Sequence, residues 1–459
     1  MSKPSNSSQQ AHRSLRQTRG VSLPTPHWRT LALSLTLVFS AVSSAATPSP
    51  AETLFDRALN LLQDNYFGYA TLNTERLRES FQPKLEVACK AFESCPYDAV
   101  SGVVSEMIAS LSDPHTYRLT PDQTGAVEAD FAGTRSLTPQ FGLTVASVPD
   151  AAALVVKRVL EAGPADLAGF KRGDLILSIN DQPLELFDSS DAAIANLKSL
   201  ERNDAKTSFK IMRGTGQSPS QSTSQSTAQL TLTVQPQRLE PWLPQLEVLP
   251  NQVGVITFFQ FKAGGHVANR VHELVRRAQG LQVRALILDV RDSAGGLVSE
   301  CLGSVGAFLE PVTQVHEFRF GRVQFEYAKG KFAQVNGDGS RSDPQVIVSN
   351  PSRWTGPLVI LTNARAKSAP EYLAYLLQHH ARARVIGQPT LGALNTSNSF
   401  FALPDKSSMA VSMGRALETD GTPYPARVTP DQIVPDAAET LASGRDLPLE
   451  RALKVLATE

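Results

Sequence analysis

Hydrophobic residues recur at helical spacing from Ala51 to about Ser112. They fall on two faces, one made of Leu54, Ala58, Leu61 and Leu62 and the other of Val100, Val103, Val104 and Met107. This pattern predicts a small helical domain. A proline disfavours helical geometry in the residue before it, so the helical pattern should end at Asp113-Pro-His-Thr116 and leave His115 in a loop.

From about Gln140 to Pro236 the helical pattern gives way to short runs of β-forming residues separated by turns. Gly169 and Gly173 bracket a turn that leads into an apolar strand. The polar, low-complexity tract from Gly216 to Ser226 lies between two strand-like runs and predicts an elongated, mobile hairpin loop. We therefore expect a separate β-rich domain here.

Strands and helices alternate from Val253 onward. The predicted order is a strand at Val253–Phe258, a helix with Val267, Val271, Leu274 and Val275 on one face, a strand at Arg284–Arg291, a helix at about Leu297–Leu309 and a strand at Pro357–Asn363. Alternation at this length predicts parallel strands joined by helical crossovers.

Ser368 stands where the apolar run Pro357–Asn363 is followed by a predicted helix. One interpretation is a helix cap, because Ser368 and Glu371 match a capping box and Pro370 suits the first helical turn. The other is a nucleophile, because a serine at a strand-to-helix turn exposes its hydroxyl near helix N-terminal amides that can stabilise an oxyanion.

Two loops follow predicted parallel strands, Asp292–Gly296 and Ala364–Ser368. The carboxyl ends of parallel strands lie along one edge of a sheet, so Gly295 and Gly296 are expected to face Ser368. Glycines let backbone amides approach a substrate carbonyl closely, as an oxyanion hole requires. A glycine turn needed only for backbone geometry is the alternative.

Composition indicates a globular protein of two or three domains, with 459 residues of which 41% are hydrophobic. Lysine and arginine together number 44, as do aspartate and glutamate, so charge gives no reason to expect a nucleic-acid partner. The cysteines and histidines lack zinc-type spacing, and we expect neither a metal nor a cofactor.

The first 46 residues have the order of an export signal: basic residues, an apolar run from Leu31 to Val42, and small residues up to Ala46. We expect cleavage after Ala45 or Ala46, with an uncleaved anchor as the alternative. In an exported protein Cys89 and Cys95 could form a local disulfide, or could remain two thiols.

Ordered motifs along the chain resemble those of the C-terminal processing (tail-specific) serine proteases. The matching segments are Asp113–Thr116, the β-rich domain, Gly254–Phe258, Leu288–Gly296, Asn363–Glu371, Ile386–Gly392 and Val428–Asp431. The family's nucleophile aligns with Ser368. The resemblance implies a multidomain α/β protein with an N-terminal helical segment, a β-rich PDZ domain and a crotonase-like α/β serine protease core.

The segment Gly163–Asn180 resembles a PDZ domain of the bacterial protease-associated kind. The resemblance implies that Gln140, Phe141, Gly142 and Leu143 form a carboxylate-binding loop that captures a peptide C-terminus. The peptide would then add as a strand to the edge of the domain. A domain that only supports the rest of the chain is the alternative.

The sequence departs from the family at the general base. Members with a Ser-Lys dyad carry a lysine and a glutamine where this chain has Ala393 and Ser397, and Thr390–Asn395 is similar to the branch that lacks this lysine. Without it, Ser368 needs another base, because a neutral hydroxyl is a weak nucleophile.

Three hypotheses follow. By resemblance to the tricorn-like branch, His115 is the base and Glu418 orients it, with Asp420 as a rival to Glu418. Histidine suits this role because its pKa of about 6.5 lets it accept and return a proton near neutral pH. In the second hypothesis Lys367 is the base. In the third the chain is a pseudoprotease that binds peptides or acts as a scaffold.

The sequence thus predicts an exported serine endopeptidase of the periplasm or cell envelope that recognises C-terminal tails of protein substrates. Ser368 and His115 carry the chemistry, and amides of Ala369 and of Gly295 or Gly296 stabilise the oxyanion. The expected divisions are 1–46 signal or anchor, 51–135 helical domain, 136–238 PDZ domain, 245–440 protease core and 441–459 helical tail. Membrane association is expected only if the signal stays uncleaved.

Overall fold

The structure is a computed structural model that describes residues 47–134, 136, 138–214 and 227–458. The predicted export segment 1–46 and the polar tract 216–226 lie outside the described residues. Among the helices that are described, none is long and apolar enough to cross a membrane.

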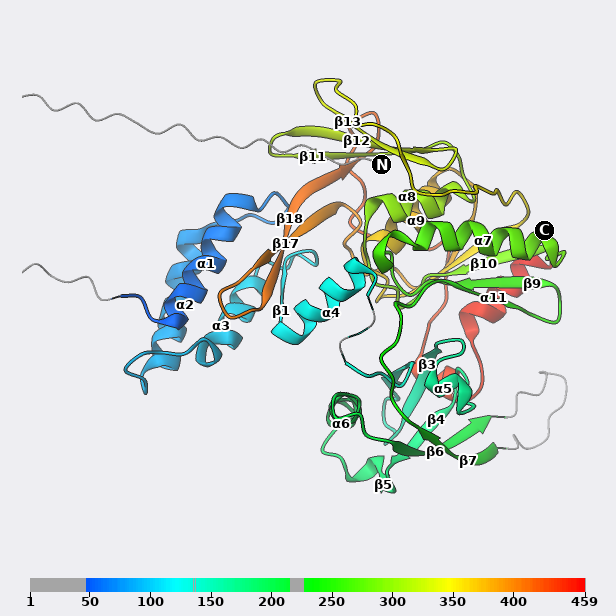
Figure 1. Cartoon of the computed structure of the whole chain (residues 1–459), viewed down its shortest axis with the longest axis horizontal. Helices are drawn as coiled ribbons and strands as arrows, with labels where there is room; N and C mark the ends of the chain where they lie inside the picture. The colour runs from blue at the N-terminus through cyan, green and yellow to red at the C-terminus, as the bar shows by residue number, and fades with distance from the viewer. Residues whose placement is uncertain (1–46, 135, 137, 215–226, 459) are drawn as a thin grey trace, which may run out of the picture. The chain divides into compact units, whose positions relative to one another are not determined.

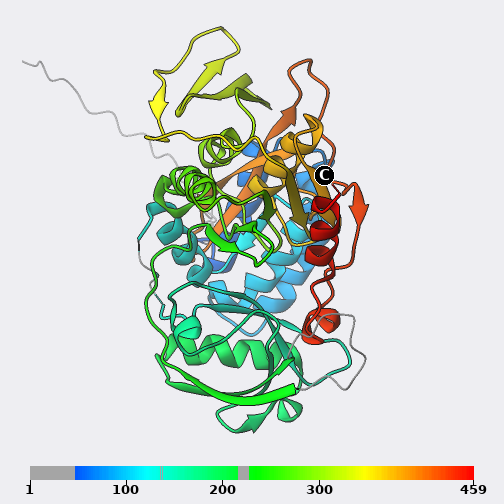
Figure 2. The same ribbon diagram turned by 90° about the vertical axis from the view of Figure 1, so that its right-hand side faces the viewer.

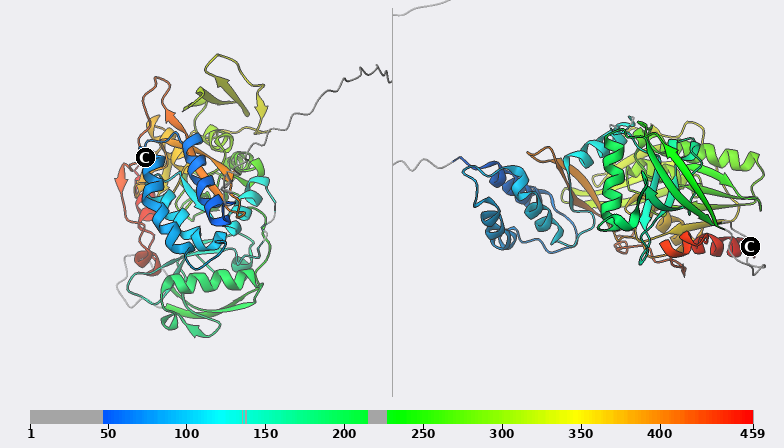
Figure 3. Two further views of the ribbon diagram at one scale, coloured as in Figure 1. Left: turned by 90° about the vertical axis from the view of Figure 1, so that its left-hand side faces the viewer. Right: turned by 90° about the horizontal axis from the view of Figure 1, so that it is seen from below.

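Helices α1 (Pro50–Asn65), α2 (Thr74–Cys89) and α3 (Tyr97–Ala109) confirm the predicted N-terminal helical region (Figures 1 and 3). A capping box begins α1, with Ser49 and Glu52 bonding each other's backbone amides. The disulfide between Cys89 and Cys95 closes the turn from α2 to α3, as one of the two expectations had it. Apolar residues of all three helices share one core.

An antiparallel sheet that the sequence did not predict connects this helical region to the rest of the chain. Its strands are β1 (Tyr117–Leu119), β11 (Val312–Phe318), β12 (Gly321–Ala328), β13 (Lys331–Asn336), β14 (Gln345–Val346), β17 (Thr396–Ala402) and β18 (Ser408–Leu417). The long strand β18 pairs with β1, β11 and β17. Its residues Met409 and Val411 also belong to the core of α1 to α3.

The β-rich domain follows α4 (Pro121–Ala132) and is seen in green in Figure 2. Its elements are β2 (Leu143–Ser147), β3 (Leu154–Val159), α5 (Pro164–Leu167), β4 (Leu175–Ile179), β5 (Gln182–Pro183), η1 (Leu184–Leu186), α6 (Ser190–Arg202), β6 (Thr207–Gly214) and β7 (Thr227–Val234). The strand order is β2-β3-β4-β6-β7, which leaves β2 at an edge. A pair of backbone hydrogen bonds between Gln140 and Gln237 joins the two ends of the domain.

The central sheet confirms the predicted alternation of parallel strands and helices. Its order is β19 (Gln432–Ile433), β16 (Arg384–Gly387), β15 (Leu358–Thr362), β10 (Ala285–Asp289), β9 (Val253–Thr257) and β8 (Gln245–Val248), with β8 antiparallel to β9. The middle strands β10 and β15 are buried at every residue, which explains why they are apolar up to their last residues, Asp289 and Thr362.

Helices cover both faces of this sheet (Figure 1). The helices η2 (Ala263–Gly265), α7 (Val267–Gly280), α8 (Val298–Gly306) and α9 (Ala369–His379) contribute to the larger core. On the opposite face, alternate strand residues pack against α11 (Leu447–Leu456), which follows α10 (Ala438–Ala442). The sheet therefore holds the carboxyl ends of β10 and β15 in fixed register, Asp289 beside Leu361.

Candidate active site

Ser368 lies between β15 and α9 in a backbone conformation that is rare for a residue with a side chain, φ 70° and ψ −116°. Strain of this kind persists only where the surroundings impose it, and it occurs often at functional sites. The Ser368 amide donates a hydrogen bond to Glu371 Oε2 at 2.7 Å. The Glu371 half of the predicted capping box is thus present, and it organises the turn that presents the serine.

Gly295 lies directly against Ser368. A Cβ atom built on Gly295 would come within 2.7 Å of Ser368 Cβ and 3.0 Å of its Oγ, so only glycine fits without a shift. At Gly296 a Cβ atom would collide with the Phe261 carbonyl at 2.1 Å. Within the described chain the amides of Gly295, Gly296 and Ala369 donate to no other residue. These are the groups that the sequence assigned to an oxyanion hole, and they lie beside the serine.

Hydrogen bonds tie the glycine loop to the serine loop. Asn363 Oδ1 accepts from the Asp292 amide at 3.0 Å, and Asn363 Nδ2 donates to Asp292 Oδ1 at 2.9 Å. The Lys367 amide donates to the Ser293 carbonyl at 3.3 Å. Because both loops are held at their backbones, the distance between the serine and the glycine amides is set by the fold rather than by flexible side chains.

The buried carboxylate of Glu371 holds the turn that contains Ser368 through hydrogen bonds. Its Oε2 also accepts from the Ala393 amide at 3.0 Å, and its Oε1 accepts from Thr390 Oγ1 at 2.6 Å and the Gly392 amide at 3.0 Å. Burial raises the pKa of this carboxyl group, while the hydrogen bonds oppose the shift. One buried side chain therefore joins the nucleophile's turn to the segment that carries the family's lysine position.

His115 is buried in the loop before β1. Its Nδ1 lies 2.8 Å from Thr396 Oγ1, and its Nε2 has no hydrogen-bond partner among the described residues. Burial lowers its pKa to about 3, and the nearby positive charge of Lys367 adds to the effect. The imidazole is therefore neutral at physiological pH, with one nitrogen able to accept a proton.

Lys367 precedes Ser368, and its amine stacks on an aromatic ring beside the histidine. The Nζ atom lies 3.5 Å from the ring centroid of Tyr117, and among the described residues it makes no ion pair within 4.0 Å. Burial lowers its pKa to about 8, although the negative charges of Glu371 and Asp113 oppose the shift. A lysine with this pKa is still mostly protonated at pH 7, but about a tenth of the molecules carry the neutral amine, far more than for an ordinary lysine.

The structure does not bring Glu418 together with His115. Glu418 Oε1 accepts from the Tyr375 hydroxyl at 2.5 Å and lies 3.9 Å from His379 Nε2. Asp420 bonds the Thr422 amide in the same turn. Neither carboxylate contacts the imidazole, whose described Nδ1 partner is the hydroxyl of Thr396.

The family's lysine and glutamine positions are occupied by groups that cannot serve as a base. Ala393 is fully buried. Ser397 Oγ lies 3.1 Å from Nδ1 of His316, a buried histidine on β11 whose pKa burial lowers to about 4. Sequence reasoning missed His316, because β11 belongs to the unpredicted sheet and only pairing with β18 brings it beside β17.

Residues 252–434 match the family model described as peptidase family S41, and residues 155–211 match a PDZ domain. The S41 match contains Ser368, both glycines and Lys367. The core of the chain is a peptidase family S41 domain.

Several named proteins resemble this chain. A carboxyl-terminal-processing protease of Synechocystis is 29% identical over 68% of this chain and 65% of its own length, so this chain spans slightly less than two thirds of that relative. A carboxyl-terminal-processing protease of Picosynechococcus is 26% identical over 93% of this chain and 94% of its own length. The solved structure of a putative S41 protease from Bacteroides fragilis shares the fold, with a TM-score of 0.53 at 14% identity, covering 88% of this chain and 97% of that one.

The loop before β2 of the PDZ domain lies close to the glycine loop that contacts Ser368. The loop residues Gln140 and Leu143, strand β2 and helix α6 line one side of a cavity of about 470 Å³. Phe258, Phe259, Gln260, Asp292 and Ala294 of the core line the other side. Because Ala294 directly precedes Gly295, the cavity borders the loop that carries the glycine amides.

A buried ion-pair network joins the PDZ domain to the core next to this cavity. Arg158 of β3 donates to both carboxylate oxygens of Asp289, at 2.7 and 2.9 Å. Arg291 donates to Asp289 at 2.8 Å and to Asp446 at 2.7 Å. The adjacent arginines hold the pKa of Asp289 well below its usual range, against the effect of burial. The network fixes the end of β10, from which the glycine loop departs.

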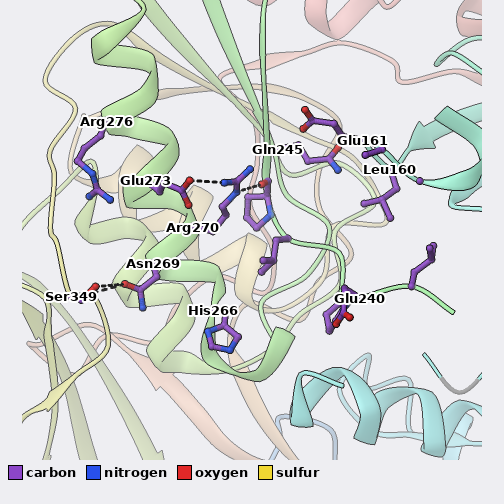
Figure 4. A pocket seen from close by; sticks show the side chains of 16 residues that line it. Leu160, Glu161, Glu240, Gln245, His266, Asn269, Arg270, Glu273, Arg276 and Ser349 are labelled. Carbon is purple, nitrogen blue, oxygen red and sulfur yellow. Dashed lines mark hydrogen bonds and ion pairs between the residues drawn. The ribbon is translucent and has the colours of Figure 1, made fainter. Parts of the chain in front are cut away.

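A second cavity, of about 960 Å³, lies between the PDZ domain and α7 (Figure 4). Leu160 and Glu161 line one side, and Arg270, Glu273 and Arg276 line the other. Arg270 pairs with Glu273 at 2.9 Å. None of the residues lining this cavity belongs to the loops around Ser368, so it plays no part in the candidate chemistry. Among the described residues no cluster of histidine, cysteine, aspartate and glutamate could hold a metal ion.

Proposed function

We propose that the chain is a serine endopeptidase that binds C-terminal tails of protein substrates through its PDZ domain and cleaves them with Ser368. The observation that carries the proposal is the shared cavity, which is lined both by the edge strand β2 and by Ala294, the residue before Gly295. An extended tail added along β2 would make main-chain hydrogen bonds with that strand and lead toward the serine.

In this reaction Ser368 Oγ attacks the carbonyl carbon of the scissile bond. The carbonyl oxygen becomes an oxyanion that accepts hydrogen bonds from the Ala369 amide and from Gly295 or Gly296. The serine proton passes to a base, which returns it to the leaving amine as the carbon–nitrogen bond breaks. A water molecule then hydrolyses the acyl-enzyme and regenerates the serine.

His115 and Lys367 are the two candidates for this base. The imidazolium that His115 would form has no carboxylate partner in the described part of the chain and lies near Lys367, so protonating His115 is unfavourable. Lys367 has a pKa of about 8, close to the pH at which a general base is most effective. We therefore favour Lys367, and we keep His115 as the alternative that resemblance suggests.

Export to the cell envelope remains part of the proposal. The order of residues in 1–46 supports it, and so does the Cys89–Cys95 disulfide, because such bonds persist mainly in oxidising compartments.

Cleavage of casein by the full-length chain, compared with Ser368→Ala, tests the proposal. We expect fragments from the parent and none from the variant. The competing function is a pseudoprotease, which Ala393 favours because the family's lysine is missing. An inactive parent that still binds C-terminal peptides would establish that second function.

A further inference from the structure

Glu201 on helix α6 reaches the loop that the proposed function assigns to substrate tails. Its Oε1 accepts a hydrogen bond from the amide of Phe141 at 2.9 Å. Phe141 lies in the predicted carboxylate-binding loop, between Gln140 and Gly142. A carboxylate of the protein itself therefore already holds one of the amides that would bind the carboxylate of a peptide.

The contact between Glu201 and Phe141 is buried, and a lysine holds the Glu201 side chain in place. Glu201 is 5% exposed and Phe141 1% exposed. The other carboxylate oxygen of Glu201 accepts from Lys198 Nζ at 2.7 Å, one helical turn earlier, and this amine extends into solvent. A charge-assisted hydrogen bond to a backbone amide is stronger than a neutral one, and burial increases the penalty for leaving the amide unpaired.

The neighbouring amide is still open. Gly142 has φ 79°, a left-handed conformation that glycine adopts readily, and among the described residues its amide donates to no other group. Both Glu201 and Lys198 line the cavity that contains the free edge of β2. A peptide carboxylate that enters this loop can accept a hydrogen bond from the Gly142 amide, but the Phe141 amide is already bonded to Glu201. The negative charge of Glu201 would also repel it.

We propose that Glu201 is a specificity-determining residue that takes the place of the tail carboxylate in the PDZ loop. This inference rests on the proposed function of that loop. A tail that ends in a free carboxylate must displace Glu201 to use the Phe141 amide, whereas a peptide segment without a terminal charge can pair with β2 while Glu201 stays in place. With Glu201 present, the site therefore discriminates little between free C-termini and uncharged or internal segments.

The need to displace Glu201 weakens the binding of a free carboxylate, because the Phe141 amide is unoccupied in only a fraction of the molecules. Removing Glu201 should restore the full set of amides and remove the repulsion between two carboxylates. We expect a free-acid peptide to bind about tenfold more tightly to Glu201→Ala, the change that corresponds to one charge-assisted hydrogen bond. The affinity of the same peptide with an amidated end should stay within about twofold.

The test uses the full-length chain carrying Ser368→Ala, so that peptides are not cleaved. A short fluorescein-labelled peptide ending in Leu-Ala-Ala, as free acid and as amide, is titrated by fluorescence anisotropy. Glu201→Gln keeps an acceptor for the Phe141 amide but removes the charge, and should give an intermediate gain for the free acid alone. Asp191→Ala removes an exposed carboxylate from the same helix and serves as the matched control.

A gain for the free acid in Glu201→Ala, absent in Asp191→Ala, supports the inference. Unchanged affinities, or equal changes for acid and amide, would overturn it and leave tail binding intact. If neither peptide binds any variant, the PDZ domain does not bind tails, and the proposed function fails together with the inference. Circular dichroism of each variant shows that the fold is retained, and Glu201→Gln remains informative if Glu201→Ala unfolds.

Discussion

Gly295 and Ser368 are so close that a methyl group on residue 295 would lie 2.7 Å from the serine Cβ atom. Real Cβ atoms do not approach other atoms so closely, so Gly295→Ala must push the two loops apart. A displacement of this size at the reacting atoms should lower kcat/KM about 100-fold or more.

Casein cleavage by Gly295→Ala and by Gly280→Ala measures this effect. A Cβ atom at Gly280, in α7, meets nothing within 4 Å, so this control should cleave at the parent rate. Equal activity of the two variants would show that the Gly295 loop does not contribute to the site.

The pH dependence of cleavage should identify the base. Burial lowers the pKa of Lys367 to about 8, and only the neutral amine can accept the serine proton. We therefore expect kcat/KM for a peptide substrate to fall as the pH is lowered through about 8. Lys367→Met should lose most of the activity, and the residual activity should not show this inflection.

The pH dependence of cleavage by His115→Ala tests the alternative base. If Lys367 is the base, His115→Ala should retain the inflection, although packing around Thr396 will lower the rate. An inflection that survives in Lys367→Met, with complete loss of activity in His115→Ala, would instead assign the proton transfer to the imidazole.

The ion pair between Arg158 and Asp289 should be important for stability. Arg158→Met leaves a buried carboxylate with fewer partners and is expected to lower the free energy of unfolding by about 3–5 kcal/mol. Urea unfolding measures this, with Arg322→Met as control. Arg322 pairs with Glu317 in an exposed position, where loss of the pair should change stability by less than about 1 kcal/mol.

Acid should weaken the same network. Besides Asp289 and Asp446, the network contains Asp436, which accepts a hydrogen bond from Arg291 at 3.1 Å. Neighbouring positive charges, Arg291 among them, lower the folded-state pKa of all three carboxyl groups against the effect of burial. Their contribution is therefore present above the unfolded pKa of about 4 and is lost as the pH falls toward the folded values. A parent whose unfolding free energy is the same at pH 3 as at pH 7 would contradict this account.

Glu371→Gln should disturb both the serine turn and the Thr390–Ala393 segment. Each carboxylate oxygen accepts two hydrogen bonds, and an amide group can replace only one of these oxygens. We expect a loss of about 2–3 kcal/mol in unfolding free energy and a strong fall in casein cleavage. Glu273→Gln, on the exposed side of α7, should change neither quantity appreciably.

Local patterns predicted the strand and helix that flank Ser368. The unbroken apolar runs of β10 and β15 and the turn chemistry at Ser368 are properties of short segments, and parallel pairing then placed Gly295 beside the serine. Partners from distant segments were not predictable. Nothing near Lys367 in the sequence indicates that Tyr117 will lie under its amine, since this contact requires the pairing of β1 with β18.

The same limit applies to Glu201 and Glu418. Glu201 appears in the sequence as one charged residue of an amphipathic helix, and only the packing of α6 against the PDZ sheet brings it to Phe141. Glu418 was placed near His115 by resemblance alone, whereas the fold pairs it with Tyr375. The order of motifs along a chain is informative about the backbone but not about which side chains meet.

The paired backbone bonds between Gln140 and Gln237 bring together two points almost a hundred positions apart in the chain. The polypeptide therefore leaves the catalytic scaffold and returns to it at nearly the same place. Recombination between genes could exchange the segment between these two glutamines without altering the path of the core chain, provided that the replacement keeps an arginine to pair with Asp289, as Arg158 does. The recognition module can thus diversify, or acquire new preferences, while the chemistry that it serves stays unchanged.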